Sequence, residues 1–152
     1  MEDDVRFMKL ALVEAEAAFA SDEVPVGAVI VARGRVIARG HNLCERLNDF
    51  TAHAEMQAFT AASEFLGGKH LGNCTLYVTM EPCPMCAGAA FWTRIGRIVY
   101  GASDAKRGYN RWGRATDERI LHPQTVVQGG VLEEECGDLV RQFFQSKHRK
   151  LS

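Results

Sequence analysis

Two short segments of the 152-residue chain carry side chains that bind metals and move protons. His53-Ala54-Glu55 offers an imidazole and a carboxylate, and Pro82-Cys83-Pro84-Met85-Cys86 follows after 26 intervening residues with two thiols. A structural zinc site usually has four protein ligands, whereas a catalytic zinc keeps one position open for water. The pattern therefore predicts one Zn²⁺ per chain in a hydrolytic site with three protein ligands. Glu55, which is not needed as a ligand, would be the base. The predicted ligands are His53, Cys83 and Cys86.

Helix starts are the elements that can bring these side chains together. Cys83 and Cys86 are three residues apart and share one face of a helical turn, and Pro84 suits the first helical position. A helix N-terminus also favours the thiolate form of cysteine. His53 and Glu55, two residues apart, do not share a helix face, so the metal must lie off the end of their helix. Thr51 and Asp49 are candidate caps for that end.

The remaining pattern alternates strands with helices, which predicts an α/β fold of three layers with helices on both faces of a sheet. In such sheets, sites lie at the carboxyl ends of strands, and the strand before Cys83 ends at the zinc segment. We expect one domain over residues 1–152. The predicted helices cover residues 2–20, 53–66, 84–93 and 131–148, and the predicted strands are Pro25–Val31, Arg35–His41, Thr75–Thr79, Arg97–Gly101 and Thr125–Gln128.

Charge is unevenly distributed, although the net charge is only −1. Residues 1–90 carry seven Lys/Arg and twelve Asp/Glu, and residues 91–152 carry eleven and seven. A local basic face can bind phosphates, but a solvated helix face explains the same pattern. No apolar run approaches the roughly 20 residues of a membrane span, and the acidic start argues against a signal peptide. We expect a cytoplasmic protein in which Cys44, Cys74 and Cys136 are buried or incidental thiols.

The combined pattern H-x-E and P-C-x-x-C resembles the zinc signature of the cytidine deaminase superfamily. Further segments, Val24–Val29, Thr51–Glu55, Met80–Cys83 and Gly101–Lys106, resemble most closely the tRNA-specific adenosine deaminases, which convert wobble adenosine to inosine. The resemblance implies a five-stranded mixed sheet, a homodimer and a tRNA anticodon stem-loop as substrate.

The resemblance also implies roles for individual residues. Glu55 would transfer protons, and Asn42 would hydrogen-bond the target base, although Asn is also a common turn former. Other substrate contacts would come from Ala54, Asp104 and Phe144, with Phe143 and Phe144 open to a core-packing role as well. The implied contacts to the RNA backbone are Lys106, Arg107, Lys147, Arg149 and Lys150.

Residues 107–114 depart from the family, which usually continues with a short Gly/Ser-rich turn. Here Arg residues alternate with Tyr109 and Trp112, so the segment could stack on unpaired bases or reshape the pocket for a small substrate. Pro84, Phe91 and Trp92 are similar to relatives that deaminate free guanine. A deaminase of guanine, cytosine or cytidine is therefore the alternative. A non-catalytic, zinc-stabilised RNA-binding module is disfavoured because Glu55 is intact and only three ligands are present.

Overall fold

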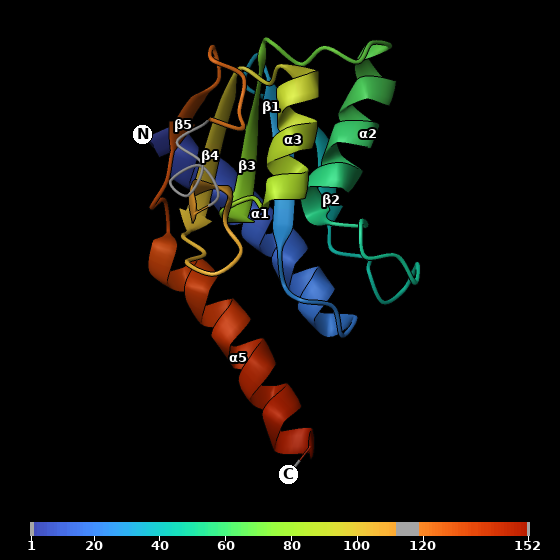
Figure 1. Cartoon of the computed structure of the whole chain (residues 1–152), viewed down its shortest axis with the longest axis vertical. Helices are drawn as coiled ribbons and strands as arrows, with labels where there is room; N and C mark the ends of the chain where they lie inside the picture. Colours follow the sequence, from blue (N-terminus) through green and yellow to red (C-terminus); the bar gives the residue numbers. More distant parts are fainter. Residues whose placement is uncertain (1, 112–118, 152) are drawn as a thin grey trace.

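The computed structural model describes residues 2–111 and 119–151. In these residues, four long helices and five strands are arranged as Figure 1 shows. The helices are α1 (Glu2–Ala20), α2 (Ala54–Leu66), α3 (Pro84–Thr93) and α5 (Glu133–Leu151). The strands are β1 (Gly27–Ala32), β2 (Arg35–His41), β3 (Cys74–Met80), β4 (Arg97–Ala102) and β5 (Val126–Gln128).

The strands form one mixed sheet in the order β2-β1-β3-β4-β5. β1 runs antiparallel to both β2 and β3, whereas β3, β4 and β5 are parallel. The predicted fold class, an α/β sheet of mixed direction, is confirmed. Because β3 and β4 are parallel and pair Met80 with Ala102, the loops that follow them leave the same end of the sheet.

Helices cover both faces of the sheet, as predicted. One core joins α2 and α3 to the inward side chains of β1, β3 and β4, with Ile30, Leu76 and Ile98 fully buried. The other core joins α1 and α5 to the opposite side chains of the same strands, including Val29, Tyr77 and Val99. Alternate residues of each strand therefore point into different cores, which is the two-residue period of a strand buried on both faces.

Two glycines permit close contact between the sheet and its helices. A side chain at Gly27 would collide with the main chain of Ala11 in α1, and one at Gly40 would lie 2.6 Å from the Ala54 carbonyl oxygen in α2. The start of α2 is thus pressed directly onto β2. In the described part of the chain, no helix is long and apolar enough to cross a membrane.

A partly buried ion pair joins α1 to the sheet at the end where β4 begins. The Arg97 guanidinium donates to both carboxylate oxygens of Asp4, at 2.7 and 2.8 Å, and the Tyr77 hydroxyl donates to the same carboxylate at 2.8 Å. The Arg97 bonds hold the pKa of Asp4 down to about 2. This network has its charge matched and its carboxylate oxygens bonded, so its role is structural.

Candidate zinc centre

Three side chains that could hold a metal ion, those of His53, Cys83 and Cys86, meet where α2 and α3 begin. The N-cap of α2 is His53 and the N-cap of α3 is Cys83, followed by Pro84 at the first helical position. The two helices lie side by side over the sheet (Figure 1). The prediction that both zinc segments are helix starts is confirmed. Because His53 is the N-cap of α2, a metal held by its ring would lie off the helix end, as its spacing from Glu55 predicts.

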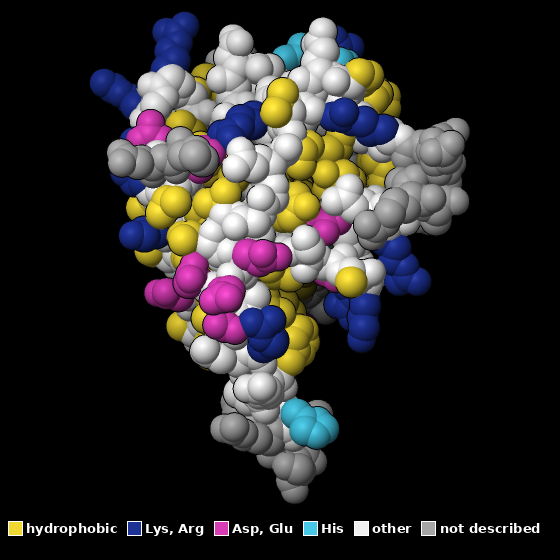
Figure 2. Space-filling view, turned by 90° about the vertical axis from the view of Figure 1, so that its left-hand side faces the viewer, with side chains coloured by type: hydrophobic (Ala, Val, Ile, Leu, Met, Phe, Trp, Pro, Cys, Tyr) yellow, Lys and Arg dark blue, Asp and Glu magenta, His cyan; other side chains and the backbone are white. Residues whose placement is uncertain are grey.

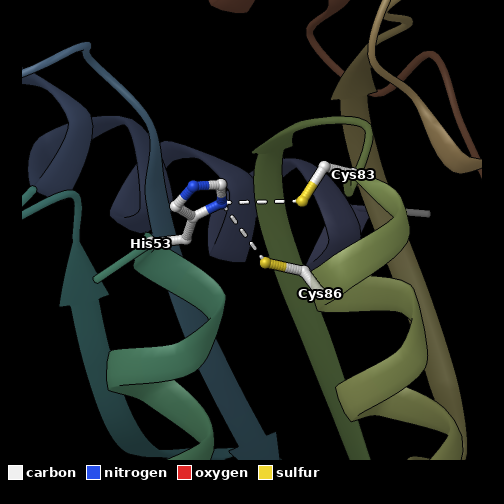
Figure 3. A group of neighbouring side chains, drawn as sticks. All are labelled: His53, Cys83 and Cys86. Carbon is white, nitrogen blue, oxygen red and sulfur yellow. Dashed lines mark hydrogen bonds between the residues drawn. The ribbon is translucent and has the colours of Figure 1, made fainter. Parts of the chain in front are cut away.

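The three side chains have the geometry of a tetrahedral zinc site. His53 Nδ1 lies 3.6 Å from Cys83 Sγ and 3.5 Å from Cys86 Sγ, and Figure 3 shows both thiols turned toward the ring. For Zn–N and Zn–S bonds of about 2.0 and 2.3 Å at tetrahedral angles, the N···S distance is about 3.5 Å. The spacing therefore fits Zn²⁺ without movement of the main chain. Across residues 2–111 and 119–151, this is the one cluster of three or more such groups.

Hydrogen bonds among the three groups shift their pKa values and leave one thiol ionised more readily than the other. Hydrogen bonds from Cys86 and then from His53 lower the pKa of Cys83 to about 4, whereas the bond to Cys83 and burial raise the pKa of Cys86. The hydrogen bond to Cys83 also raises the pKa of His53. A metal ion replaces the protons that these groups hold, since zinc binds thiolate and neutral imidazole.

Glu55 lies in the first turn of α2 and is 4 % exposed. Burial raises the pKa of its carboxyl to about 7, and the Cys86 thiol and the His53 ring lie near enough to pull that pKa down in part. A proton-transfer group works best with a pKa near the working pH. Glu55 therefore combines contact with a metal-binding thiol, burial and a suitable pKa.

A protein-family comparison decides which zinc chemistry this is. Residues 1–102 match the family model of the cytidine and deoxycytidylate deaminase zinc-binding region. The chain belongs to this deaminase family. It is a zinc-dependent hydrolytic deaminase, with zinc as its cofactor.

Individual relatives resemble this deaminase over nearly their full length. The chain is 47 % identical to a tRNA-specific adenosine deaminase of Agrobacterium fabrum over 97 % of both chains. A tRNA-specific adenosine deaminase of Bacillus subtilis is 45 % identical, over 99 % of this chain and 94 % of the relative.

Solved structures show the same fold. One from a study of A-to-I editing by tRNA:A34 deaminases matches with a TM-score of 0.82 and 47 % identity, covering 88 % of this chain and 98 % of that one. A guanine deaminase from Nitrosomonas europaea matches with a TM-score of 0.78 but 26 % identity, covering 91 % and 83 %.

Asn42 holds the start of the deaminase's α2 in place. Its Oδ1 accepts the Ala54 N–H at 2.8 Å, and its Nδ2 donates to the Val24 carbonyl at 3.1 Å. The expectation that Thr51 or Asp49 caps this helix is wrong, because Asp49 instead accepts both the N–H and the hydroxyl of Thr51. Asn42, twelve residues before Ala54, supplies the bond through a tertiary contact.

Glu81 is a buried carboxylate whose role the sequence did not reveal. Its two oxygens accept the Asp104 N–H at 3.1 Å and the Asn110 N–H at 3.0 Å, which holds the loop after β4 against the zinc segment. Gly108 lies so close that a side chain there would collide with the carboxylate of Glu81. The available signal was an acid directly before Pro82, since a carboxylate at a buried strand end needs partners.

The predicted substrate residues separate into two regions. Asn42 and Ala54 are buried beside the zinc centre. Asp104 Oδ1 accepts the main-chain N–H groups of Lys106 and Arg107, whose side chains are exposed in the loop after β4. These residues come from the same end of the sheet as the metal-binding trio.

The predicted residues of the last helix lie farther out. Figures 1 and 2 show the end of α5 projecting beyond the body, with Phe144 47 % exposed and Phe143 buried. Lys147 Nζ contacts Asp22 Oδ2 at 2.5 Å. The side chains of Arg149 and Lys150, and residues 112–114 of the atypical segment, lie outside the described residues.

Proposed function

We propose that this deaminase converts adenosine to inosine at the wobble position of tRNA. The observation that carries the proposal is the similarity of 45–47 %, over almost the whole chain, to two enzymes named for that substrate class. Similarity to guanine deaminases supports the shared reaction type more than a shared substrate, since those of Nitrosomonas europaea and Bacillus subtilis are 26 % and 38 % identical, the latter over only 75 % of this chain.

The proposed reaction is hydrolytic: water adds at C6 of adenine and the amino group leaves as ammonia. His53, Cys83 and Cys86 would hold the zinc, which when bound lowers the pKa of a water molecule from 15.7 toward about 7. Glu55 would take one proton from the attacking water and deliver it to ring nitrogen N1, and would then move the proton of the new C6 hydroxyl to the departing amino group, which leaves as ammonia. Proton transfer of this kind contributes roughly 10²–10⁴ in rate.

Residues around the zinc centre would position the base. Asn42 already uses its oxygen and one amide hydrogen within the protein, which leaves its second amide hydrogen for a purine nitrogen. Ala54 and Asp104 would border the base. Lys106, Arg107, Lys147, Arg149 and Lys150 would contact phosphates, and Phe144 would contact the anticodon loop.

We also propose a homodimer in the cytoplasm. Along α3 the exposed side chains include Met85, Phe91 and Trp92, the last 77 % exposed. Gly88 lies open, with nothing within 4 Å of where its side chain would start, so a second helix could approach closely here. Sedimentation at micromolar concentration would test this assembly, and a monomer mass would contradict it.

Zinc-loaded protein incubated with an anticodon stem-loop tests the substrate directly. We expect inosine at the wobble position with equimolar ammonia. Parallel reactions contain guanine, cytosine, cytidine and adenosine. Rapid turnover of a free base with an inert stem-loop would contradict the proposal and favour the small-substrate alternative.

Charge reversal provides a second test of RNA binding. The triple variant Lys147→Glu, Arg149→Glu, Lys150→Glu should raise KM for the stem-loop and flatten its salt dependence. The log–log slope should fall by about 0.7 for each phosphate that the variant no longer neutralises. Turnover of any free nucleoside should be unchanged. An unaltered salt slope would remove α5 from the RNA-binding surface.

A further inference from the structure

The most exposed large apolar side chain described in this protein is Phe50, which is 92 % exposed. It lies three residues before His53, in the loop that joins β2 to α2, and Leu47 of the same loop is 52 % exposed. An aromatic ring in water is unfavourable, and neither core includes it. Its position beside a metal-binding residue calls for a functional explanation.

The loop that carries Phe50 is held firmly. Glu23, which is 1 % exposed, accepts the Glu45 N–H at 2.9 Å and the Arg46 N–H at 2.8 Å. The Leu43 N–H donates to the Ala52 carbonyl at 2.9 Å, so the two ends of the loop are bonded to each other. Phe50 is thus presented on a fixed main chain, which lowers the entropy cost of using its ring in binding.

The same residue is linked to the zinc centre through its main chain. Its peptide lies in the turn that leads to the predicted metal ligand, where the Ala52 N–H donates to the Asp49 carbonyl at 3.1 Å and the His53 N–H donates to the Thr51 carbonyl at 2.8 Å. The Phe50 side chain is therefore carried by a hydrogen-bonded turn that ends at His53. Phe50 borders the zinc centre.

We propose that Phe50 is a stacking platform for the unpaired nucleobase next to the target adenosine in an RNA substrate. This inference rests on the proposed function. When a target base leaves the stack, its neighbour loses a stacking partner, and an aromatic face restores that contact without reading base identity. A phenyl ring has no hydrogen-bonding group, so Phe50 would accept any neighbouring base.

Substitutions of Phe50 test the platform. Phe50→Ala should raise KM for the stem-loop by about 5-fold to 150-fold, the usual effect of losing one base–aromatic stack. Phe50→Trp should keep the wild-type KM, and Phe50→Leu should resemble Phe50→Ala because it retains bulk but not the flat ring. Turnover of free adenosine, where detectable, should be the same in all variants.

Phe65→Ala is the matched control. Phe65 is also exposed, at 67 %, but it lies near the other end of α2, about 18 Å along the helix from His53 at 1.5 Å per residue. This control should leave KM unchanged. Equal losses in Phe50→Ala and Phe65→Ala would indicate a general effect of surface apolar groups and would overturn the proposal.

An abasic substrate separates this inference from the proposed function. Stem-loops that lack the base 5′ or 3′ of the target are compared with the intact stem-loop. For one of these two abasic substrates, Phe50→Ala should have the same KM as the wild type. If the wild-type protein leaves the intact stem-loop unreacted, the proposed function fails and the inference with it. If the wild type is active but Phe50→Ala matches it, or if Phe50→Ala converts a dimer to a monomer, only the platform is overturned.

Discussion

Asp4 and Glu55 are both buried carboxylates, but they belong to opposite ends of the sheet and have opposite surroundings. Asp4 is paired with Arg97 and bonded to Tyr77, and the pKa of its carboxyl falls to about 2. Glu55 is buried, the His53 ring is the one cation that lowers its pKa among the described residues, and the pKa of its carboxyl rises to about 7. A carboxylate with matched charge stabilises the fold, whereas one kept near neutral pKa can exchange protons.

The free-energy cost of burying a carboxylate also differs between the two ends of the sheet. At the Asp4 end the burial of charge is offset by a two-point Arg bond. At the Glu55 end the cost of burial is only partly offset within the protein, and the three side chains beside it could hold a cation. Stability and activity should therefore respond separately to changes at the two ends.

Removing a predicted metal ligand, at the Glu55 end of the sheet, should have the largest effect. Cys83→Ala should reduce zinc from one per chain to nearly none, abolish turnover, and lower Tm by roughly 5–15 °C, because bound zinc stabilises the folded form. Metal analysis and calorimetry measure both effects. Cys44→Ala, which alters a half-buried thiol of the β2–α2 loop, is the matched control, and full zinc content in Cys83→Ala would contradict the ligand set.

Removing the Asp4 carboxylate, at the opposite end of the sheet, should have a smaller effect, and it should lower stability without changing activity. Asp4→Asn should lower the free energy of unfolding at pH 7 by about 1–2 kcal/mol, less than the full pKa shift implies because Arg97 is partly open to solvent. Urea unfolding measures the loss. Zinc content and kcat should match the wild type, and a fall in kcat with unchanged stability would reverse the assigned roles.

Lowering the pH should have the smallest effect. It should reduce the stability that the Asp4 carboxylate contributes. Because the folded pKa of Asp4 is lower than its unfolded value, its contribution is full above about pH 5 and fades as pH falls toward 2. The difference in unfolding free energy between wild type and Asp4→Asn should shrink by roughly half at pH 3. Groups common to both proteins, including the zinc residues, cancel in this difference. A difference that grows with acid would exclude a depressed pKa.

Most of the fold could be predicted because its signals are local. The predicted helix over residues 53–66 is observed as Ala54–Leu66 and ends at Gly67 with a φ of 68°, a conformation that glycine adopts readily. The zinc trio could likewise be predicted from spacing, because residues three apart on a helical turn share a face, which places Cys83 and Cys86 together.

The rest depends on contacts between segments distant in the sequence. Nothing near Asn42 indicates that its side chain bonds the start of α2, and nothing near Glu23 or Glu81 indicates which loop each carboxylate holds. Periodicity also predicts the last helix from residue 131, whereas it begins at Glu133, since Leu132 has a φ of 54°. Such features need the folded chain.

The direct test of the two-carboxylate account is turnover per bound zinc in Glu55→Gln, measured beside Asp4→Asn on the same anticodon stem-loop. Glutamine has the shape of glutamate but cannot carry the proton. The account predicts that Glu55→Gln keeps one zinc per chain and a Tm at least equal to the wild type while its turnover falls by at least about 10²-fold. Wild-type turnover in Glu55→Gln, or loss of its zinc, would contradict the role assigned to Glu55.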